Sequence, residues 1–253
     1  MEPFKDHFSS VASAYARHRP DYPPELAAYF AEIAPRRGLA WDCGCGSGQF
    51  SRLLADHFAH VIATDPSAEQ LSAAPRHPRI DYRQEKAERT SLPDHAVDII
   101  TVAQAAHWFA LEDFYAEVRR VAAPGAILAL ITYASLETGD SELDRIINDF
   151  YDGVLGTTFW PPERRHIEAG YRTLAFPFAE IAAPPFSIVH EWSVADVLGY
   201  IETWSAVSNL KKAGRGKDFE DFSIRLAAHW AKGAARRRVR WPLAMRVGRV
   251  SAL

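Results

Sequence analysis

The first half of the chain repeats a pattern in which a short apolar run is followed by a stretch with amphipathic helical spacing. The predicted strands are Leu39–Trp41, Val61–Thr64, Ile80–Arg83, Val97–Val102 and Ala126–Ile131. The predicted helices are Pro24–Ile33, Gln49–His57, 67–74 and Leu111–Val121. Strands that alternate with helices indicate a parallel sheet covered by helices on both faces. The sequence therefore predicts an α/β fold with a Rossmann-like, mostly parallel sheet that binds ligands at the carboxyl ends of its strands.

The second half of the chain has less regular patterning. Helical spacing recurs at 140–155, 193–212 and 217–232. Alternation from Val239 to Val247 predicts a one-sided strand, and Pro242 favours a start after that residue because proline cannot donate to a sheet ladder. We therefore expect a helical cap after the last of the parallel strands, followed by sheet-completing strands at the C-terminus. The expected parts are an N-terminal helical segment at 1–35, a Rossmann-like core at 36–135, and the cap with the final strands at 136–253.

The composition is that of an ordinary globular protein, with 253 residues of which 48% are hydrophobic and 24% charged. The formal net charge of −3 argues against a protein that coats nucleic acid. Neither a signal-peptide pattern nor an apolar run of membrane-spanning length occurs, so we expect a soluble, cytoplasmic protein. Cys43 and Cys45 are too close for an unstrained disulfide and too few for a zinc site, so we expect reduced thiols and no bound metal.

The turn after the first predicted strand contains three glycines, Gly44, Gly46 and Gly48. Glycine permits a tight turn there and lets the backbone approach a ligand closely. The spacing is neither that of the dinucleotide fingerprint nor that of a phosphate-binding loop. Asp65 ends the next predicted strand, where a carboxylate can accept hydrogen bonds from both hydroxyls of a ribose. An N-cap of the following helix is the structural alternative for Asp65. Together the loop and the acid predict a ligand that contains a nucleoside.

The segment Asp42-Cys-Gly-Cys-Gly-Ser-Gly48 resembles motif I of the class I methyltransferases that bind S-adenosylmethionine. The resemblance runs from about Phe8 to Tyr133, and within this stretch the sequence is similar to the methyltransferase type 11 group. The strings Arg-Pro-x-Tyr-Pro and Gln-Ala-x-His-Trp-Phe also resemble the trans-aconitate methyltransferase-like branch. The resemblance implies S-adenosylmethionine as cofactor and methyl transfer to a small-molecule acceptor, and the narrower branch implies a carboxylate.

The resemblance also implies roles for individual residues. Asp65 would hold the ribose, Ala87 and Glu88 would contact the adenine, and Lys86 stands where the family commonly has an aspartate. Tyr15 and Arg19 would close the site from the N-terminal segment, Arg19 being either a partner for a carboxylate or a surface residue. The cofactor-binding residues implied in this way are Asp42, Gly44, Gly46, Gly48, Asp65, Ala87, Glu88, Ala103, Gln104 and Arg19.

The acceptor side of the site is predicted from polar and aromatic residues. His107 is the best candidate for a general base, and a structural histidine in an aromatic cluster is its alternative. Tyr15 either polarises the acceptor or packs. A carboxylate acceptor would need no base. Predicted substrate contacts are Trp108, Trp160, Arg164 and Tyr171, with a solvated loop as the alternative for the arginine.

Other functions stay open on this pattern. A non-catalytic protein that binds S-adenosylmethionine would carry the same loop. A nucleic-acid methyltransferase is disfavoured because Ala103–Ala106 replaces the Asn/Asp-Pro-Pro motif, although the basic cluster Arg236–Arg240 could touch phosphates. A nicotinamide oxidoreductase is disfavoured by the glycine spacing. The pattern gives no indication of the oligomeric state.

Overall fold

The computed structural model describes residues 20–250, and their contacts divide them into two compact units. The first, here called the sheet unit, contains residues 21–133, 165–186 and 243–250. The second, here called the helical unit, contains residues 134–164 and 187–242 together with Pro20. The two units therefore interleave along the chain, since the chain leaves the sheet unit and returns to it twice.

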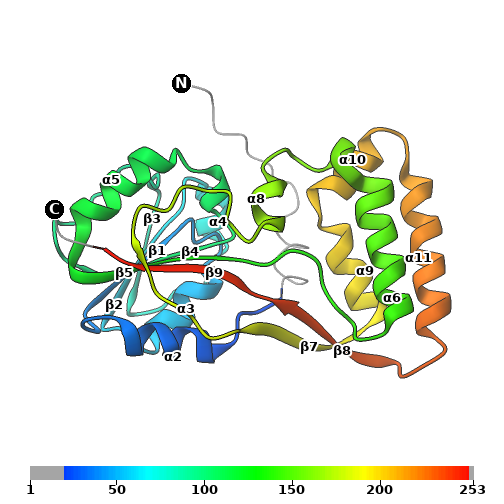
Figure 1. Ribbon diagram of the computed structural model, residues 1–253, viewed down its shortest axis with the longest axis horizontal. Helices are drawn as coiled ribbons and strands as arrows, with labels where there is room; N and C mark the ends of the chain where they lie inside the picture. The colour runs from blue at the N-terminus through cyan, green and yellow to red at the C-terminus, as the bar shows by residue number, and fades with distance from the viewer. Residues whose placement is uncertain (1–19, 251–253) are drawn as a thin grey trace. The chain divides into compact units, whose positions relative to one another are not determined.

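A 7-stranded sheet with the strand order β3-β2-β1-β4-β5-β9-β6 forms the centre of the sheet unit (Figure 1). Its strands are β1 (Leu39–Cys43), β2 (His60–Thr64), β3 (Ile80–Arg83), β4 (Val97–Ala103), β5 (Ala122–Thr132), β6 (Ala179–Glu180) and β9 (Ala244–Arg249). Strands β1 to β5 pair in parallel, while β9 runs antiparallel to both β5 and β6. The predicted fold class is confirmed, because the parallel strands are the apolar runs of the sequence.

Helices cover both faces of this sheet (Figure 1). The described helices of the sheet unit are α2 (Pro24–Ile33), α3 (Gln49–Ala55), α4 (Ala68–Ser72), the 3₁₀ turn η2 (Ala106–Trp108), α5 (Leu111–Val121) and α8 (Arg164–Glu168), whose first residue belongs to the helical unit. Successive residues of β1 face opposite sides, as a strand requires. Trp41 packs on Phe114 of α5, with ring centroids 6.1 Å apart, and Asp42 faces Ser51 of α3. The core of the unit therefore has two layers, one on each face of the sheet.

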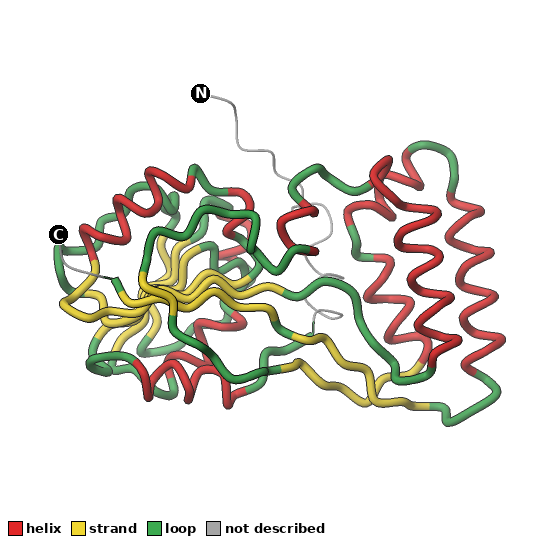
Figure 2. The backbone as a smooth tube through the Cα atoms, in the orientation of Figure 1, coloured by secondary structure: helices red, strands yellow, loops and turns green. Residues whose placement is uncertain are grey.

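The helical unit consists of helices and a two-stranded sheet (Figure 2). Its helices are α6 (Ser141–Asn148), the π-helix η3 (Asp149–Leu155), α7 (Gly156–Phe159), α9 (Val194–Glu202), α10 (Ser205–Lys212) and α11 (Gly216–Trp230). Its strands β7 (Ser187–Ser193) and β8 (Arg236–Pro242) pair antiparallel. The predicted helix at 193–212 is broken at Thr203–Trp204, and it begins after Ser193, which forms a capping box with Asp196.

The prediction that a C-terminal strand starts after Pro242 is confirmed, because β9 begins at Ala244. The alternating segment 239–247 does not form one strand, because it divides between β8 and β9, which belong to different sheets. The division falls at Pro242 and Leu243. Proline has no N–H to continue a ladder, and Leu243 donates its amide to the carbonyl of Phe186 outside both sheets. Strand β7, the partner of β8, was not predicted from the sequence.

Candidate cofactor and acceptor site

The glycine loop after β1 folds back onto the end of β2. Gly44, Gly46 and Gly48 have φ angles of 68°, 54° and 77°, a left-handed backbone that glycine adopts without steric cost. The amides of Gly44 and Cys45 both donate to the carbonyl oxygen of Thr64, at 2.8 and 3.0 Å. These two hydrogen bonds hold the bend against the end of β2.

The surroundings of these glycines differ in a way that indicates where a ligand fits. A Cβ at Gly44 would lie 2.6 Å from the Cβ of Ala105, and one at Gly48 would lie 2.3 Å from the hydroxyl of Tyr82. Among residues 20–250, a Cβ at Gly46 would meet only the side-chain oxygen of Gln70, at 3.7 Å. Close packing explains two of the glycines, whereas the backbone of Gly46 has room for a ligand beside it. This part of the loop fits the expected nucleoside-bearing cofactor.

Asp65, which directly follows β2, bonds to the loop through its carboxylate. One oxygen accepts the amide of Gly46 at 2.9 Å, and the other accepts the amide of Ser67 at 2.9 Å. The N-cap of α4 is Ser67, whose side chain accepts from Gln70, so the alternative of Asp65 as N-cap does not hold. A carboxylate has about four lone-pair positions, so one such group can accept hydrogen bonds from several donors at once.

Asp42, predicted to bind the cofactor, lies inside the sheet unit with only 1% of its surface exposed. Its oxygens accept hydrogen bonds from Ser51 of α3 at 2.6 Å and from Thr101 of β4 at 3.0 Å. Burial raises the pKa of Asp42 to about 6, although both hydroxyls lower it. The side chain therefore connects β1, α3 and β4 from beneath the glycine loop.

Two of the predicted cofactor-binding residues, Ala103 and Gln104, lie at the end of β4. Ala103 is the last residue of the strand, and Gln104 follows it with a φ of 60°, which is unfavourable for a residue with a side chain. The amide nitrogen of Gln104 donates to the carbonyl of Tyr133 at 2.9 Å, and its oxygen accepts from Thr132 at 2.6 Å. The end of β5 thus holds Gln104 in this conformation.

His107 lies directly beyond this turn, in η2, and contacts two aromatic residues. Its Nδ1 lies 3.0 Å from the hydroxyl of Tyr171, and its ring centroid lies 4.7 Å from that of Trp108. Trp108 is 39% exposed, whereas Tyr171 is fully buried. The structure therefore brings three predicted catalytic or substrate residues together at the carboxyl end of β4.

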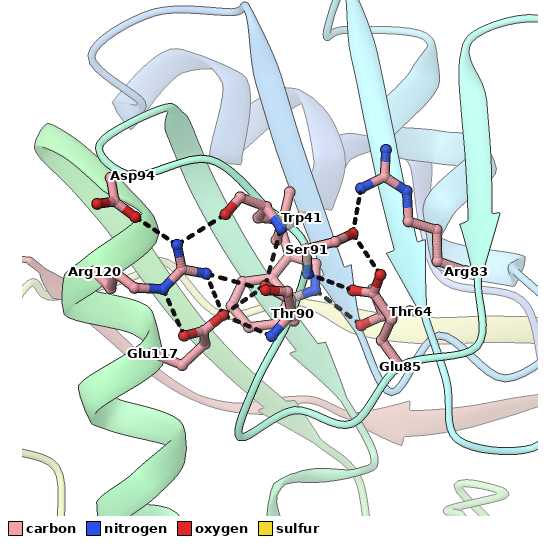
Figure 3. Close-up of polar contacts among 10 residues, drawn as sticks. Trp41, Thr64, Arg83, Glu85, Thr90, Ser91, Asp94, Glu117 and Arg120 are labelled. Carbon is pink, nitrogen blue, oxygen red and sulfur yellow. Dashed lines mark hydrogen bonds and ion pairs between the residues drawn. The ribbon is translucent and has the colours of Figure 1, made fainter.

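The segment between β3 and β4, which carries Ala87 and Glu88, is held against α5 (Figure 3). Thr90 donates its amide and hydroxyl to Glu117, at 2.7 and 2.6 Å. The guanidinium of Arg120 bonds to Glu117, to Asp94 and to the carbonyl oxygens of Thr90 and Leu92. Burial alone would raise the pKa of Glu117, but the hydrogen bonds from Arg120 and Thr90 lower it overall.

The two predicted adenine residues differ in exposure. Ala87 is buried, with 5% of its surface exposed, while the carboxylate of Glu88 accepts the amide of Ala110 at the start of α5, at 3.0 Å. Both roles toward adenine stay predictions. Tyr15 and Arg19, predicted to close the site, lie outside the described residues.

Two further predicted substrate residues belong to the helical unit and contact each other. The guanidinium of Arg164 stacks on the ring of Trp160, 4.5 Å from its centroid, and donates to the hydroxyl of Tyr151 at 2.6 Å. Trp160 also packs on Trp204, with centroids 5.5 Å apart. These residues form one aromatic cluster around the π-helix, and their role toward a substrate stays a prediction.

Sequence reasoning did not identify the residues that hold the site in place, which are Ser51, Thr101, Tyr133, Glu117 and Arg120. One available signal was strand register, because Thr101 lies opposite Asp42 in the β1–β4 pairing. A parallel alignment of the two predicted strands places these residues on one face of the sheet. No comparable pattern in the sequence predicts the contact of Glu117 with Thr90.

The basic cluster Arg236–Arg240 is engaged within the helical unit. Arg236 pairs with Asp196 at 3.4 Å, Arg237 with Asp140 at 2.8 Å, and Arg240 with Glu137 at 3.0 Å. These ion pairs give the arginines a structural role that does not involve phosphates.

Between residues 20 and 250, the structure contains no helix that combines the length and the apolar character of a membrane span.

Comparison with known proteins agrees with this geometry. Residues 41–130 match the model of a methyltransferase domain family. A proposed methyltransferase of Dictyostelium discoideum is 34% identical over 213 residues, which cover 83% of this chain and 81% of that protein. A solved structure of a proposed type II methyltransferase from Anaeromyxobacter dehalogenans is 46% identical, with a TM-score of 0.86, and the match covers 93% of this chain and 99% of that chain.

The malonyl-(acyl-carrier protein) O-methyltransferase of Serratia marcescens is 30% identical over 187 residues, which cover 66% of this chain and 72% of that protein. The narrower resemblance to the trans-aconitate methyltransferase-like branch stays a prediction. The glycine loop, the strand-end acid, the sheet and these relatives lead to one family. The chain belongs to the class I methyltransferases of the type 11 group, and it is an enzyme whose methyl donor is S-adenosylmethionine.

Proposed function

We propose that the protein transfers a methyl group from S-adenosylmethionine to an oxygen of a small-molecule carboxylate. The observation that carries the cofactor half of the proposal is the loop around Gly46, whose open backbone lies beside the Asp65 carboxylate. Asp65 would accept the ribose hydroxyls, and Gly46 would allow the cofactor to approach the main chain closely. When bound, the cofactor supplies an activated methyl group on a sulfonium, so the protein contributes orientation and exclusion of water.

The acceptor half of the proposal rests on chemistry and on one relative. The Serratia marcescens relative is named for O-methylation of a malonyl group, whose free oxygen nucleophile is a carboxylate. An ionised carboxylate attacks without losing a proton, so a site for it needs no general base. Trp108, beside β4, is 39% exposed, and an exposed aromatic face would attract a sulfonium charge.

The cofactor half is tested by replacing Asp65. The variant D65A should weaken the binding of S-adenosylhomocysteine by about 1.5–3 kcal/mol, the range for hydrogen bonds to charged groups. Isothermal titration calorimetry measures this change. D56A is the matched control. Asp56 is an exposed carboxylate at the C-terminal end of α3, whereas the glycine loop precedes the N-terminal end of that helix, so this substitution should leave the affinity unchanged. Equal affinity in D65A and the wild type would contradict the proposed cradle.

The acceptor half is tested with methyl-labelled S-adenosylmethionine and a panel of small carboxylic acids, each paired with its primary amide. We expect label to enter only the acids, and the products should release methanol on mild alkaline hydrolysis because they are esters. Transfer that favours the amides, or label that resists hydrolysis, would contradict a carboxylate acceptor. The cofactor assignment would survive that result, because calorimetry tests it separately.

A further inference from the structure

Tyr171 reaches His107 from a strained turn. Gly170 and Tyr171 follow α8 with φ angles of 58° and 62°, so two successive residues have a left-handed backbone. For a tyrosine this conformation is sterically unfavourable and persists only where the surroundings enforce it. A Cβ at Gly170 would lie 2.8 Å from that of Ala244 on β9, so the turn packs tightly on the sheet.

Several hydrogen bonds fix this turn. The amide of Tyr171 donates to the carbonyl of His166 at 2.7 Å, and Arg246 of β9 donates to the carbonyls of Tyr171 and Leu174, at 3.4 and 2.7 Å. The side chain of Tyr171 is fully buried and its hydroxyl lies 3.0 Å from Nδ1 of His107. The fold therefore accepts local strain in order to hold a phenol against one particular ring nitrogen of His107.

The direction of that hydrogen bond follows from the two groups. A phenol is a strong donor and a weak acceptor, whereas the unprotonated nitrogen of a neutral imidazole is a strong acceptor. The better arrangement has Tyr171 donating to Nδ1, which requires the ring proton to be on Nε2. We infer that Tyr171 is a positioning residue that holds His107 as the Nε2–H tautomer, and that His107 donates a hydrogen bond to the acceptor rather than removing a proton from it.

This role deepens the proposed function and rests on it for the identity of the acceptor. A donor at the carboxyl end of β4 suits an anionic oxygen, since hydrogen bonds to charged groups are the strong ones. In the transfer, a lone pair of the carboxylate oxygen forms the bond to the methyl carbon, and the electron pair of the broken carbon–sulfur bond stays on sulfur. A neutral ester and a neutral thioether result, and no proton moves. His107 thus orients the carboxylate without exchanging a proton with it.

The tautomer is tested directly by nuclear magnetic resonance on the full chain labelled with ¹⁵N-histidine. Comparison with H107Q assigns the His107 signals. We expect Nε2 to carry the proton in the wild type, and we expect Y171F to give a mixture of both tautomers. Y115F is the matched control, because Tyr115 is also buried but donates its hydroxyl to the carbonyl of Ala175, at 2.6 Å. A proton on Nδ1 in the wild type, or a Y171F spectrum identical to the wild type, would overturn the inference.

Kinetics with any carboxylic acid that the labelling panel identifies gives the second readout. In Y171F and H107Q, KM for the acid should rise about tenfold, the effect of losing one hydrogen bond, while kcat should change less than about threefold. A large fall in kcat with an unchanged KM would show that His107 acts as a base and would overturn the inference. If no acid is methylated, the proposed acceptor fails, and the resonance experiment still decides the tautomer.

Discussion

Asp42 is an acid that the fold keeps in an unfavourable state at neutral pH. The carboxylate is buried, it accepts hydrogen bonds from the neutral hydroxyls of Ser51 and Thr101, and the negative charge of Asp65 lies near enough to disfavour its ionisation further. Burial therefore raises the pKa of Asp42 to about 6 from an ordinary value of 3.8. The side chain organises the glycine loop at a cost in stability that depends on pH.

The variant D42N should be more stable than the wild type at pH 8. Folding raises the pKa of this group, so its contribution to the stability of the wild type is fully present below pH 3.8 and is lost as the pH rises through about 6. Asparagine has the same shape and no charge, so D42N should gain about 1–3 kcal/mol at pH 8 and nothing near pH 4. Urea unfolding at both pH values measures the difference. A difference that does not vary with pH would show that Asp42 is not the group responsible.

The glycine loop offers a second comparison between single residues. Alanine at Gly46 has only the unfavourable φ to accommodate, and should cost about 1–2 kcal/mol of unfolding free energy. Alanine at Gly48 also overlaps the ring of Tyr82, and should cost about 1–3 kcal/mol more. Denaturant unfolding of G46A and G48A gives both values. Equal losses in the two variants would mean that Tyr82 can move aside at no cost.

Among the elements, α5 has the most direct influence on the cofactor side of the molecule. Glu117 and Arg120 lie one turn apart on this helix, and both bond to the segment 90–94. Glu117 accepts the amide and hydroxyl of Thr90, and Arg120 donates to two main-chain carbonyls and one carboxylate of the segment. The segment that carries Ala87 and Glu88 therefore cannot move independently of this helix. We expect the network to determine how rigid the adenine side of the site is.

The variant E117A should cost about 2–3 kcal/mol, because it leaves the guanidinium of Arg120 and the amide of Thr90 without their shared partner. Amide hydrogen exchange should increase in residues 84–94. E142A is the control, because the pair of Glu142 with Arg145 on α6 is exposed and its loss should leave the stability almost unchanged. Equal effects of the two substitutions on stability would refute a special role for Glu117.

The elements also show how far the sequence alone could lead. The strands β1, β2, β4 and β5 are largely buried, so their apolar runs stand out and were predicted. Strand β7 was missed because its residues Ser187–Ser193 include charged and polar groups and are mostly half-exposed. The glycine loop and Asp65 could be predicted because they follow consecutive strands. The contact of His107 with Tyr171 could not be predicted, since no local pattern links residues so far apart in the chain.

At the scale of the whole molecule, the interleaving of the two units determines how the chain can be divided. The parallel strands all lie within residues 21–133, yet β5 is also paired along its other edge with β9, which comes after the entire helical unit. A Rossmann-like core cut at residue 133 would expose that edge, and an exposed apolar edge strand favours aggregation.

The fragment 21–133 should therefore aggregate or remain unfolded when it is expressed alone. Co-expression with the fragment 134–253 should restore a soluble complex, because the second fragment supplies β9. Size-exclusion chromatography and circular dichroism test both expectations. A monomeric, cooperatively folded 21–133 fragment would show that pairing with β9 is dispensable.

The late position of β9 in the sequence also affects how the sheet forms during synthesis on the ribosome. While the ribosome makes the residues between Thr132 and Ala244, the nascent sheet has every parallel strand but lacks the neighbour that covers β5. At ordinary elongation rates this interval is on the order of ten seconds, much longer than a small domain needs to collapse. During that time the nascent chain exposes the unpaired apolar edge of β5. Chaperones that bind such edges would act in this interval.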